Sequence, residues 1–495
     1  MVSRILGYVR DAMVAHVFGG AGVTDAFYAA FRIPNLLRRF FGEGSFTAAF
    51  VPVFTDVLAK GDEREARRFF NSVFTGLSLL LALIVGLGIL FAPWVARVAA
   101  WGFSRDPVQI ALTTDLVRLT FPFLLFVCLA ALASGTLNAR GRFFVPALAP
   151  AGLSVAEIAF MLFLASRFED PVYGLAMSAA AGGFLHWAFQ LPSLKREGYL
   201  PALAVPRRSD TTRILALMAP TVIGLSSDQI NAYVDTLCAS FLTPGSVTAL
   251  YNSNRVMQLP LALFGIAVSS VALPALSAAS ARKDEKDYKE TLSFALRVAN
   301  FLIIPAATGL IVIGRPIVEL LFEHGRFTGR ETGLTTAALA PFCLGLPAYA
   351  STKILASAFF AFKDTRTPVR ASVWSMVVNV ALSLALMWRW GVAGLAAATA
   401  AAAWTNSAIL FFFLRRHVGL LGGRAILRSA AGVLAASAPM AVAAWLLTNR
   451  LPGPVLVRVA AGVGGGFLVF LASAAALGLE ERRHLKTWLG RSHEA

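Results

Sequence analysis

Cysteine, histidine and charge are all scarce in this sequence. Only three cysteines occur, Cys128, Cys238 and Cys343, and their number and spacing argue against a disulfide framework or a cysteine metal site. The six histidines are scattered, and no G-x-x-x-x-G-K-[ST] phosphate loop is present, which argues against ATP hydrolysis on this chain. Charged residues make up 14% of the 495 positions, where a soluble protein carries about a quarter.

Apolar residues are correspondingly abundant, at 57% of the chain, and they recur in runs long enough to cross a bilayer. We therefore expect an all-α polytopic membrane protein with about fourteen transmembrane helices. No cleavable signal peptide is expected, because the first span begins almost at residue 1. The predicted spans are 2–19, 24–58 (bent), 68–93, 109–138, 147–166, 171–194, 211–242, 245–281, 288–314, 331–362, 367–388, 391–415, 426–448 and 454–479.

The net charge of +17 is explained by topology rather than by nucleic-acid binding. If the N-terminus is cytoplasmic, the cytoplasmic connections hold 25 Lys and Arg residues and the opposite connections hold nine. By the positive-inside rule this asymmetry places both termini in the cytoplasm. The same basic residues favour contact with anionic lipid headgroups.

The sequence also contains an internal repeat. Tyr28, Arg32, Phe41 and Gly42 recur 223 positions later as Tyr251, Arg255, Phe264 and Gly265, and Asp62 and Glu63 recur 222 positions later as Asp284 and Glu285. The repeat predicts two six-helix lobes in the same orientation, related by an axis along the membrane normal. The predicted domains are an N-terminal lobe at 1–200, a C-terminal lobe at 205–418, two extra helices at 425–479 and a cytoplasmic tail at 480–495.

Arginine inside the predicted spans points to function. One arginine at the centre of a span costs roughly 2.5–3.5 kcal/mol, so several are retained only where they face water, a counter-ion or an anionic ligand. Guanidinium groups bind phosphate in a bidentate manner, which favours a phosphate or pyrophosphate ligand in a cavity between the lobes. The predicted substrate-binding residues are Arg4, Arg10, Asp25, Asn35, Arg38, Glu43 and Arg255.

A topological interpretation of the same arginines stays open. Arg38 and Arg39 could mark a cytoplasmic helix end, and Arg4 could extend to the membrane interface. Glu43 could serve as an ion-pair partner of a neighbouring arginine. We interpret Glu157, inside the fifth span, as a packing residue.

Oxygen-bearing side chains in the C-terminal half form a second candidate site. Asp235 in the seventh span, Asn379 in the eleventh and Thr399 in the twelfth together predict a Na⁺ or H⁺ site that couples transport to an ion gradient. The alternative is an interhelical hydrogen-bonded patch. No other cofactor is expected.

Several motifs resemble those of the MurJ (MviN) lipid II flippases, a family within the multidrug/oligosaccharidyl-lipid/polysaccharide exporter superfamily. The resemblance covers essentially the whole chain, including two extra C-terminal helices. Its motifs are Ser3-Arg4-Ile-Leu-Gly7-Tyr-Val-Arg10-Asp11, Thr24-Asp25-Ala-Phe-Tyr28, Pro34-Asn35-Leu-Leu-Arg38-Arg39 with Glu43-Gly44, and Phe50-Val-Pro52.

This resemblance implies that the substrate is lipid II, a polyprenyl-pyrophosphate-linked peptidoglycan precursor. It implies transport from the inner to the outer leaflet of the bacterial plasma membrane, alongside the cell-wall synthesis machinery as a possible partner. The family's functional arginines match Arg4, Arg10, Arg38 and Arg255, with Asp25 beside them. The extra helices are implied to form a groove for the lipid tail.

Three other functions are considered. A cation-coupled exporter of drugs or of another polyprenyl-linked oligosaccharide would have a cavity dominated by acidic or aromatic residues rather than arginine. A non-transporting scaffold for cell-wall enzymes would tolerate the loss of Arg38 and Arg255. A membrane-embedded enzyme would need a catalytic constellation, and the sequence contains none that we recognise.

Overall fold

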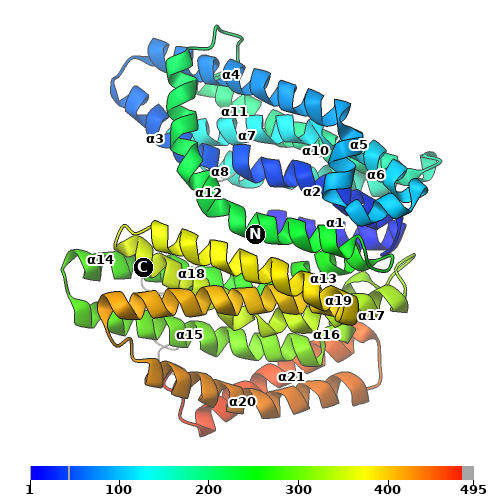
Figure 1. The fold of residues 1–495 in the computed structure, drawn as a ribbon, viewed down its shortest axis with the longest axis vertical. Helices are drawn as coiled ribbons and strands as arrows, with labels where there is room; N and C mark the ends of the chain where they lie inside the picture. The colour runs from blue at the N-terminus through cyan, green and yellow to red at the C-terminus, as the bar shows by residue number, and fades with distance from the viewer. Residues whose placement is uncertain (1, 43–44, 482–495) are drawn as a thin grey trace. The chain divides into compact units, whose positions relative to one another are not determined.

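The structure is a computed structural model that describes residues 2–42 and 45–481, and within these ranges all regular structure is helical. The helices group by contact into two compact units (Figure 1). Unit 1 comprises residues 1–248 with 324–328, and unit 2 comprises residues 249–323 with 329–495. The fold class predicted from sequence, an all-α polytopic membrane protein, is confirmed.

Unit 1 contains the first twelve α-helices and the start of the thirteenth. Several membrane-length stretches are built from two consecutive helices, such as α2 with α3 and α6 with α7. The helices are α1 (Val2–Phe18), α2 (Val23–Phe41), α3 (Ser45–Ala59), α4 (Glu63–Leu90), α5 (Ala92–Ala99), α6 (Pro107–Thr120), α7 (Pro122–Ala139), α8 (Phe144–Leu148), α9 (Ala151–Phe163), α10 (Pro171–Ala188), α11 (Leu191–Arg196) and α12 (Arg208–Ala239), with 3₁₀ turns η1 (Trp101–Arg105) and η2 (Ala165–Arg167).

Unit 2 continues from α13 and contains the longest helices. Its longest, α19, is two helices joined at a kink at Gly391, which has φ 55° and ψ −133°. The elements are α13 (Ser246–Pro260), the π-helical turn η3 (Leu261–Gly265), α14 (Ile266–Ala281), α15 (Glu285–Val312), α16 (Gly314–Phe322), α17 (Gly329–Leu344), α18 (Leu346–Ala361), α19 (Arg366–Val418), α20 (Gly423–Arg450) and α21 (Val455–Ala476).

The helix order repeats between the units in the way the sequence predicts. Asp62 caps the N-terminus of α4 by accepting hydrogen bonds from backbone N–H groups, and Asp284 caps α15 in the same way. The short helix α5 that follows α4 corresponds to α16, which follows α15. The break after α2 at Gly42 corresponds to η3, which ends at Gly265. Equivalent residues therefore interrupt or begin equivalent helices.

Contacts and the sequence repeat divide the chain at different places. Helix α12 packs on α2, α3, α4 and α5 and so belongs to unit 1, although the repeat assigns it to the lobe at 205–418. The segment before it also lies along α4, where Ala204 N donates to Thr75 Oγ1 at 3.0 Å and Arg207 N donates to Ser72 Oγ at 2.8 Å. The two six-helix lobes at 1–200 and 205–418 stay a prediction. Most of the predicted tail at 480–495 lies outside the described residues.

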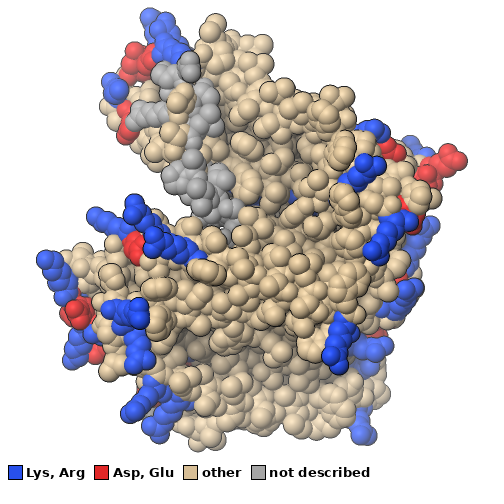
Figure 2. Space-filling view, in the orientation of Figure 1, with Lys and Arg blue, Asp and Glu red and all other residues tan. Residues whose placement is uncertain are grey.

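Every predicted span coincides with one helix or with consecutive helices, and the two spans predicted at 367–388 and 391–415 are the halves of α19. Within the described residues, eight helical stretches are long and apolar enough to cross a membrane, or nine if the bent pair α17–α18 counts as one span. The count of fourteen stays a prediction. In each unit, charged side chains lie mostly toward the helix ends and uncharged residues cover the surface between them (Figure 2).

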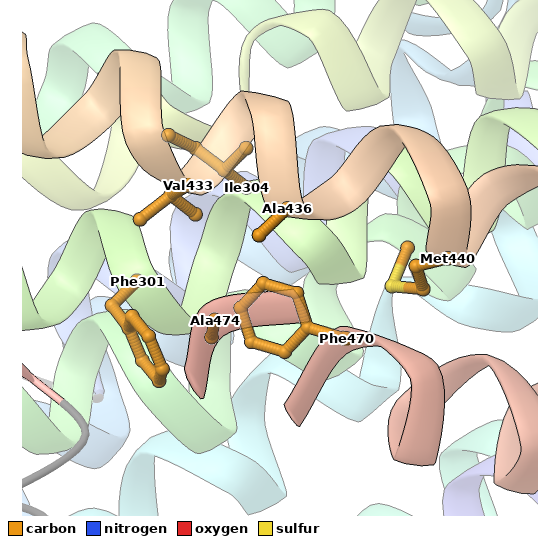
Figure 3. Close-up of a cluster of buried hydrophobic side chains, with 7 residues drawn as sticks. All are labelled: Phe301, Ile304, Val433, Ala436, Met440, Phe470 and Ala474. Carbon is orange, nitrogen blue, oxygen red and sulfur yellow. The ribbon is translucent and has the colours of Figure 1, made fainter. Parts of the chain in front are cut away.

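Helices α20 and α21 are fixed to the rest of unit 2 by an apolar cluster. Phe301 and Ile304 of α15 meet Val433, Ala436 and Met440 of α20 in this cluster (Figure 3). Phe470 and Ala474 of α21 complete it, and the ring centroids of Phe301 and Phe470 lie 5.2 Å apart. The extra C-terminal helices are therefore packed into unit 2 rather than appended to it loosely.

Glycine allows the close approach of α20 and α21. A Cβ atom added to Gly462 would lie 2.0 Å from Thr448 Oγ1 and 3.1 Å from the carbonyl oxygen of Ala444. Two residues along the same helix, a Cβ atom on Gly464 would meet nothing within 4 Å. Gly462 thus serves helix packing, because small residues let transmembrane helices approach closely.

We expect Gly462→Ala to destabilise the protein by about 1–3 kcal/mol, because the added methyl group overpacks the contact with the conformationally stiff Thr448 side chain. The matched control Gly464→Ala should be neutral or stabilising by up to about 1 kcal/mol. The measurement is the temperature at which half of the detergent-solubilised protein stays monodisperse. Equal midpoints for the two variants would contradict this account of the α20–α21 contact.

Candidate functional site

The two arginines of α1 have different surroundings. Arg4 is exposed, whereas the side chain of Arg10 is 13% exposed and forms ion pairs. Its Nη2 and Nε atoms lie 2.6 and 2.9 Å from Asp11 Oδ1, and Nε lies 3.3 Å from Glu157 Oε2 of α9. Both carboxylates are buried, with side chains 1% and 3% exposed. Among the described side chains, Arg10, Asp11 and Glu157 therefore form a buried cluster of charged groups that ties α1 to α9.

Sequence reasoning does not assign Asp11 and Glu157 to the site. Asp11 could have been noticed because it adjoins Arg10 within a matched motif. Glu157 is a single carboxylate in an otherwise apolar run, and such a residue is a functional hypothesis by default. Its pairing with Arg10 depends on the packing of α1 against α9, which no local pattern encodes.

Asp25 is used to cap a helix. Its carboxylate accepts hydrogen bonds from the backbone N–H of Gly245 at 2.6 Å, the backbone N–H of Thr248 at 2.8 Å and the Thr248 hydroxyl at 2.6 Å. These donors lie at the start of α13, where a carboxylate also complements the helix dipole. Asp25 is 2% exposed, so this structure gives it a structural role at the helix that carries Arg255.

The second half of α2 carries a further set of polar residues. Arg38 Nε donates to Asn35 Oδ1 at 2.9 Å, and Arg32 Nε donates to Thr236 Oγ1 of α12 at 2.8 Å. Arg38 and Asn35 are half-buried, and Arg39 is exposed. Thus two predicted ligands, Asn35 and Arg38, are brought together on one face of α2.

The helix continues through Pro34 and stops at Phe41. Gly42 follows with its backbone beside Cys128 of α7, since an added Cβ would lie 3.4 Å from Cys128 Sγ. The span predicted as bent at 24–58 is therefore interrupted after Phe41, at Gly42. The predicted residue Glu43 lies outside the described residues.

Arg255 lies in the last turns of α13 and is half-buried. The π-helical turn η3 comes directly after Pro260, at Leu261–Gly265. Such turns occur frequently at functional sites because they reposition neighbouring side chains. Arg255 is assigned to unit 2, whereas Arg4, Arg10, Arg38 and Asn35 are in unit 1.

The residues of the predicted cation site also belong to different units. Asp235 of α12 is in unit 1 and is 8% exposed, while Asn379 and Thr399, both on α19, are in unit 2. Asn379 Nδ2 donates to Thr399 Oγ1 at 3.0 Å, which confirms that these two side chains meet. Asn379 Oδ1 and Ser383 Oγ are buried and accept no hydrogen bond among the described residues. Across the described residues, no group of three or more His, Cys, Asp and Glu side chains could hold a metal ion.

A cavity of about 1060 Å³ lies within unit 2. Its wall is mostly apolar and comes from α15, α17, α18, the second half of α19 and α20. Arg415 and Arg424 line it beside the loop that joins α19 to α20. Helix α21 packs on α20 and contributes no lining residue in the described part of the chain. Of the two extra helices predicted to form a groove for the tail, only α20 lines this cavity.

Solved structures show the same fold. A structure described as "Lipid II flippase MurJ, inward closed conformation" superposes with a TM-score of 0.83 at 27% identity and covers 96% of both chains. The inward-facing conformation of a multidrug resistance MATE family transporter superposes with a TM-score of 0.70 at 13% identity, covering 85% of this chain and 95% of that one, which establishes similarity of fold alone.

Sequence relatives agree with this fold. A "Probable lipid II flippase MurJ" from Vibrio cholerae is 36% identical, with 83% of this chain and 80% of the relative aligned. A "Lipid II flippase MurJ" from Burkholderia cenocepacia is 35% identical over 84% and 82%, and a "Probable lipid II flippase MurJ" from Rhizobium meliloti is 34% identical over 94% and 92%. Residues 14–460 match the family model for "Lipid II flippase MurJ". The chain therefore belongs to the MurJ lipid II flippase family.

Proposed function

We propose that this protein flips lipid II from the inner to the outer leaflet of the bacterial plasma membrane, with both termini in the cytoplasm. The observation that carries the proposal is membership of the MurJ family across residues 14–460. It is a transporter and not an enzyme. The half-buried arginines of α1, α2 and α13 support an anionic headgroup as its cargo.

The proposed mechanism is alternating access. The pyrophosphate enters from the cytoplasmic side and is bound by Arg10, Arg38 and Arg255. Guanidinium groups suit this task because they stay charged and present several N–H donors in a planar fork. Once the headgroup has neutralised these charges, the binding residues become exposed to the outer side of the membrane. The membrane potential then biases the return of the empty carrier, since one charge crossing 100 mV is worth about 2.3 kcal/mol.

The cavity in unit 2 supports a place for the polyprenyl tail, and Arg415 and Arg424 line it beside the loop that joins α19 to α20. A tail that leaves the bilayer gains little from the hydrophobic effect, because lipid hydrocarbon is already apolar. The cavity is therefore proposed to guide the tail rather than to supply affinity.

A coupling cation is a further part of the proposal. Buried oxygens without donors, Asn379 Oδ1 and Ser383 Oγ, are suitable ligands for a hard cation such as Na⁺. Asp235 would supply the negative charge. The buried oxygens of α19 support ion coupling, whereas the Asn379–Thr399 hydrogen bond fits the alternative of a purely structural hydrogen-bonded patch.

The arginines can be tested in a bacterium depleted of its own flippase. We expect the wild-type chain to make the lipid-linked precursor accessible to a cleaving enzyme added outside the cell. Arg38→Ala and Arg255→Ala should lower the initial rate of this cleavage by about 10–100-fold, because each loses a charge-assisted hydrogen bond worth about 1.5–3 kcal/mol. Arg389→Ala, at an exposed position of α19, is the matched control.

Arg38→Lys tests whether charge alone is sufficient, and it should restore activity only in part because an ammonium group does not bind in a bidentate manner. Normal cleavage with well-expressed Arg38→Ala and Arg255→Ala would show that these residues do not bind the headgroup. No rescue by the inserted wild-type chain would favour the alternative, an exporter of drugs or of another polyprenyl-linked oligosaccharide.

The tail cavity is tested by filling it. Ala408 lines the cavity on α19, whereas Ala435 is an exposed residue of α20 outside the lining. We expect Ala408→Trp to slow transport of the full-length substrate several-fold and to leave transport of a short-chain analogue unchanged, and Ala435→Trp to slow neither. The measurement is flipping in vesicles containing the purified chain. Equal slowing of the long and short substrates by Ala408→Trp would argue against a tail in this cavity.

Ion coupling is tested with Asp235→Asn in the same vesicles. We expect the wild-type rate to respond to an imposed Na⁺ or H⁺ gradient and the variant to lose that response, because the cation loses its only charged ligand in the proposed set. If the variant and the wild type respond equally to both gradients, Asp235 does not couple transport to an ion.

A further inference from the structure

The buried cluster of Arg10, Asp11 and Glu157 contains two acidic groups and one basic group, an excess of acid that the headgroup-binding role of Arg10 alone does not explain. One guanidinium group is paired with two carboxylates, whose side chains are 1% and 3% exposed. If all three groups are ionised, the cluster carries one net negative charge. A net charge is costly to bury in a low-dielectric interior, and a carboxylic acid avoids the cost by binding a proton.

The two carboxylates are not held equally. Asp11 Oδ1 accepts from both Nη2 and Nε of Arg10, at 2.6 and 2.9 Å, whereas Glu157 approaches Nε alone at 3.3 Å. Shorter charge-assisted contacts favour the ionised form more strongly. Asp11 is therefore the better counter-ion of Arg10, and Glu157 is the group on which a proton is bound at least cost.

The elements packed against α9 carry other titratable groups as well. On α10, the backbone of His186 lies beside Gly152, five residues from Glu157, which is about 7.5 Å along the helix. Tyr173 precedes Gly174, which lies against Phe160. The full set besides Arg10 and Asp11 is Arg4, Tyr8 and His16 on α1, Tyr173 and His186 on α10, and Arg167 on η2.

We propose that Glu157 is a proton-binding residue of the transport cycle, and that it takes up a proton from water when the anionic headgroup binds at Arg10. The proposal rests on the proposed function, in which that headgroup is a pyrophosphate. With Glu157 ionised, the cluster is net negative and repels an anion. With Glu157 protonated, the cluster is neutral and Arg10 can share its charge between Asp11 and the phosphate oxygens.

The direction of the pH dependence follows from linkage. Because the protonated form binds the anion better, raising the pH through the titration of Glu157 weakens binding. Linkage to one proton changes the dissociation constant by at most about tenfold per pH unit. Reciprocity requires that headgroup binding promotes proton uptake to the same extent.

The experiment uses the full chain in lipid nanodiscs and has two readouts. The first is the infrared C=O stretch of a protonated carboxylic acid, followed against pH without substrate. The second is the dissociation constant of lipid II against pH. We expect a titrating acid band and an affinity that falls with rising pH for the wild type. Glu157→Gln should lack both the band and the pH dependence, and should bind as tightly as the protonated wild type.

Three further variants separate a proton site from a structural role. Glu157→Asp should keep the pH dependence and shift the acid band, because the proton moves to a different carboxylic acid. Asp11→Asn should abolish the band, because Glu157 then stays ionised as the counter-ion of Arg10. Glu169→Gln makes the same chemical change at an exposed position of unit 1 and should behave as the wild type.

The outcomes distinguish failure of this inference from failure of the proposed function. An acid band that persists unchanged in Glu157→Gln overturns the assignment of the proton to Glu157, even if lipid II binds. If Glu157→Gln loses the band but the affinity of the wild type for lipid II does not depend on pH, the linkage between protonation of Glu157 and headgroup binding is overturned. A titrating band on Glu157 in a protein that binds no lipid II supports the proton site and refutes the proposed substrate.

Discussion

The burial of arginine in an apolar surrounding is the constraint on which the rest of this structure depends. A guanidinium group is retained there only with oxygen partners, because its isolated charge is costly to desolvate. Arg10 finds two carboxylates, Arg32 finds the Thr236 hydroxyl and Arg38 finds the Asn35 amide oxygen. Some of these partners lie on other helices, so the contacts that make the charge tolerable also fix α1 against α9 and α2 against α12.

Local pattern predicts the helices well and their partners poorly. Runs of apolar residues predict where the membrane-length helices lie. Asp62 and Asp284 mark equivalent helix starts, because a cap depends on residues only two or three positions away. The pairing of Arg10 with Glu157 depends on which helices pack together, and so does the capping of α13 by Asp25. The assignment of α12 to unit 1 also depends on packing, because α12 contacts α3, whereas the sequence repeat groups it with the lobe at 205–418. Sequence therefore predicts that arginine is the functional element, and it does not reveal what each arginine contacts.

The large cavity of unit 2 illustrates a difference between membrane and soluble binding sites. An apolar pocket in a soluble protein gains free energy by removing a ligand from water, whereas a polyprenyl chain moves from one hydrocarbon environment to another. On the proposed function, the cavity beside α20 selects the shape and path of a tail without holding it tightly. Affinity would then come from the headgroup, because charge-assisted hydrogen bonds are strong in a region of low dielectric constant.

Strong headgroup binding creates a requirement on the empty carrier. When no anion is bound, Arg38 and Arg255 retain their positive charges in a partly buried environment, and an ionised Glu157 beside Arg10 offsets part of this excess. On the proposals made above, the anion supplies negative charge when it binds, and protonation of Glu157 removes one unit of that charge. Protonation therefore reduces, without cancelling, the change in net charge between the empty and the loaded states. A smaller change in charge means a smaller electrostatic barrier in either direction of the cycle.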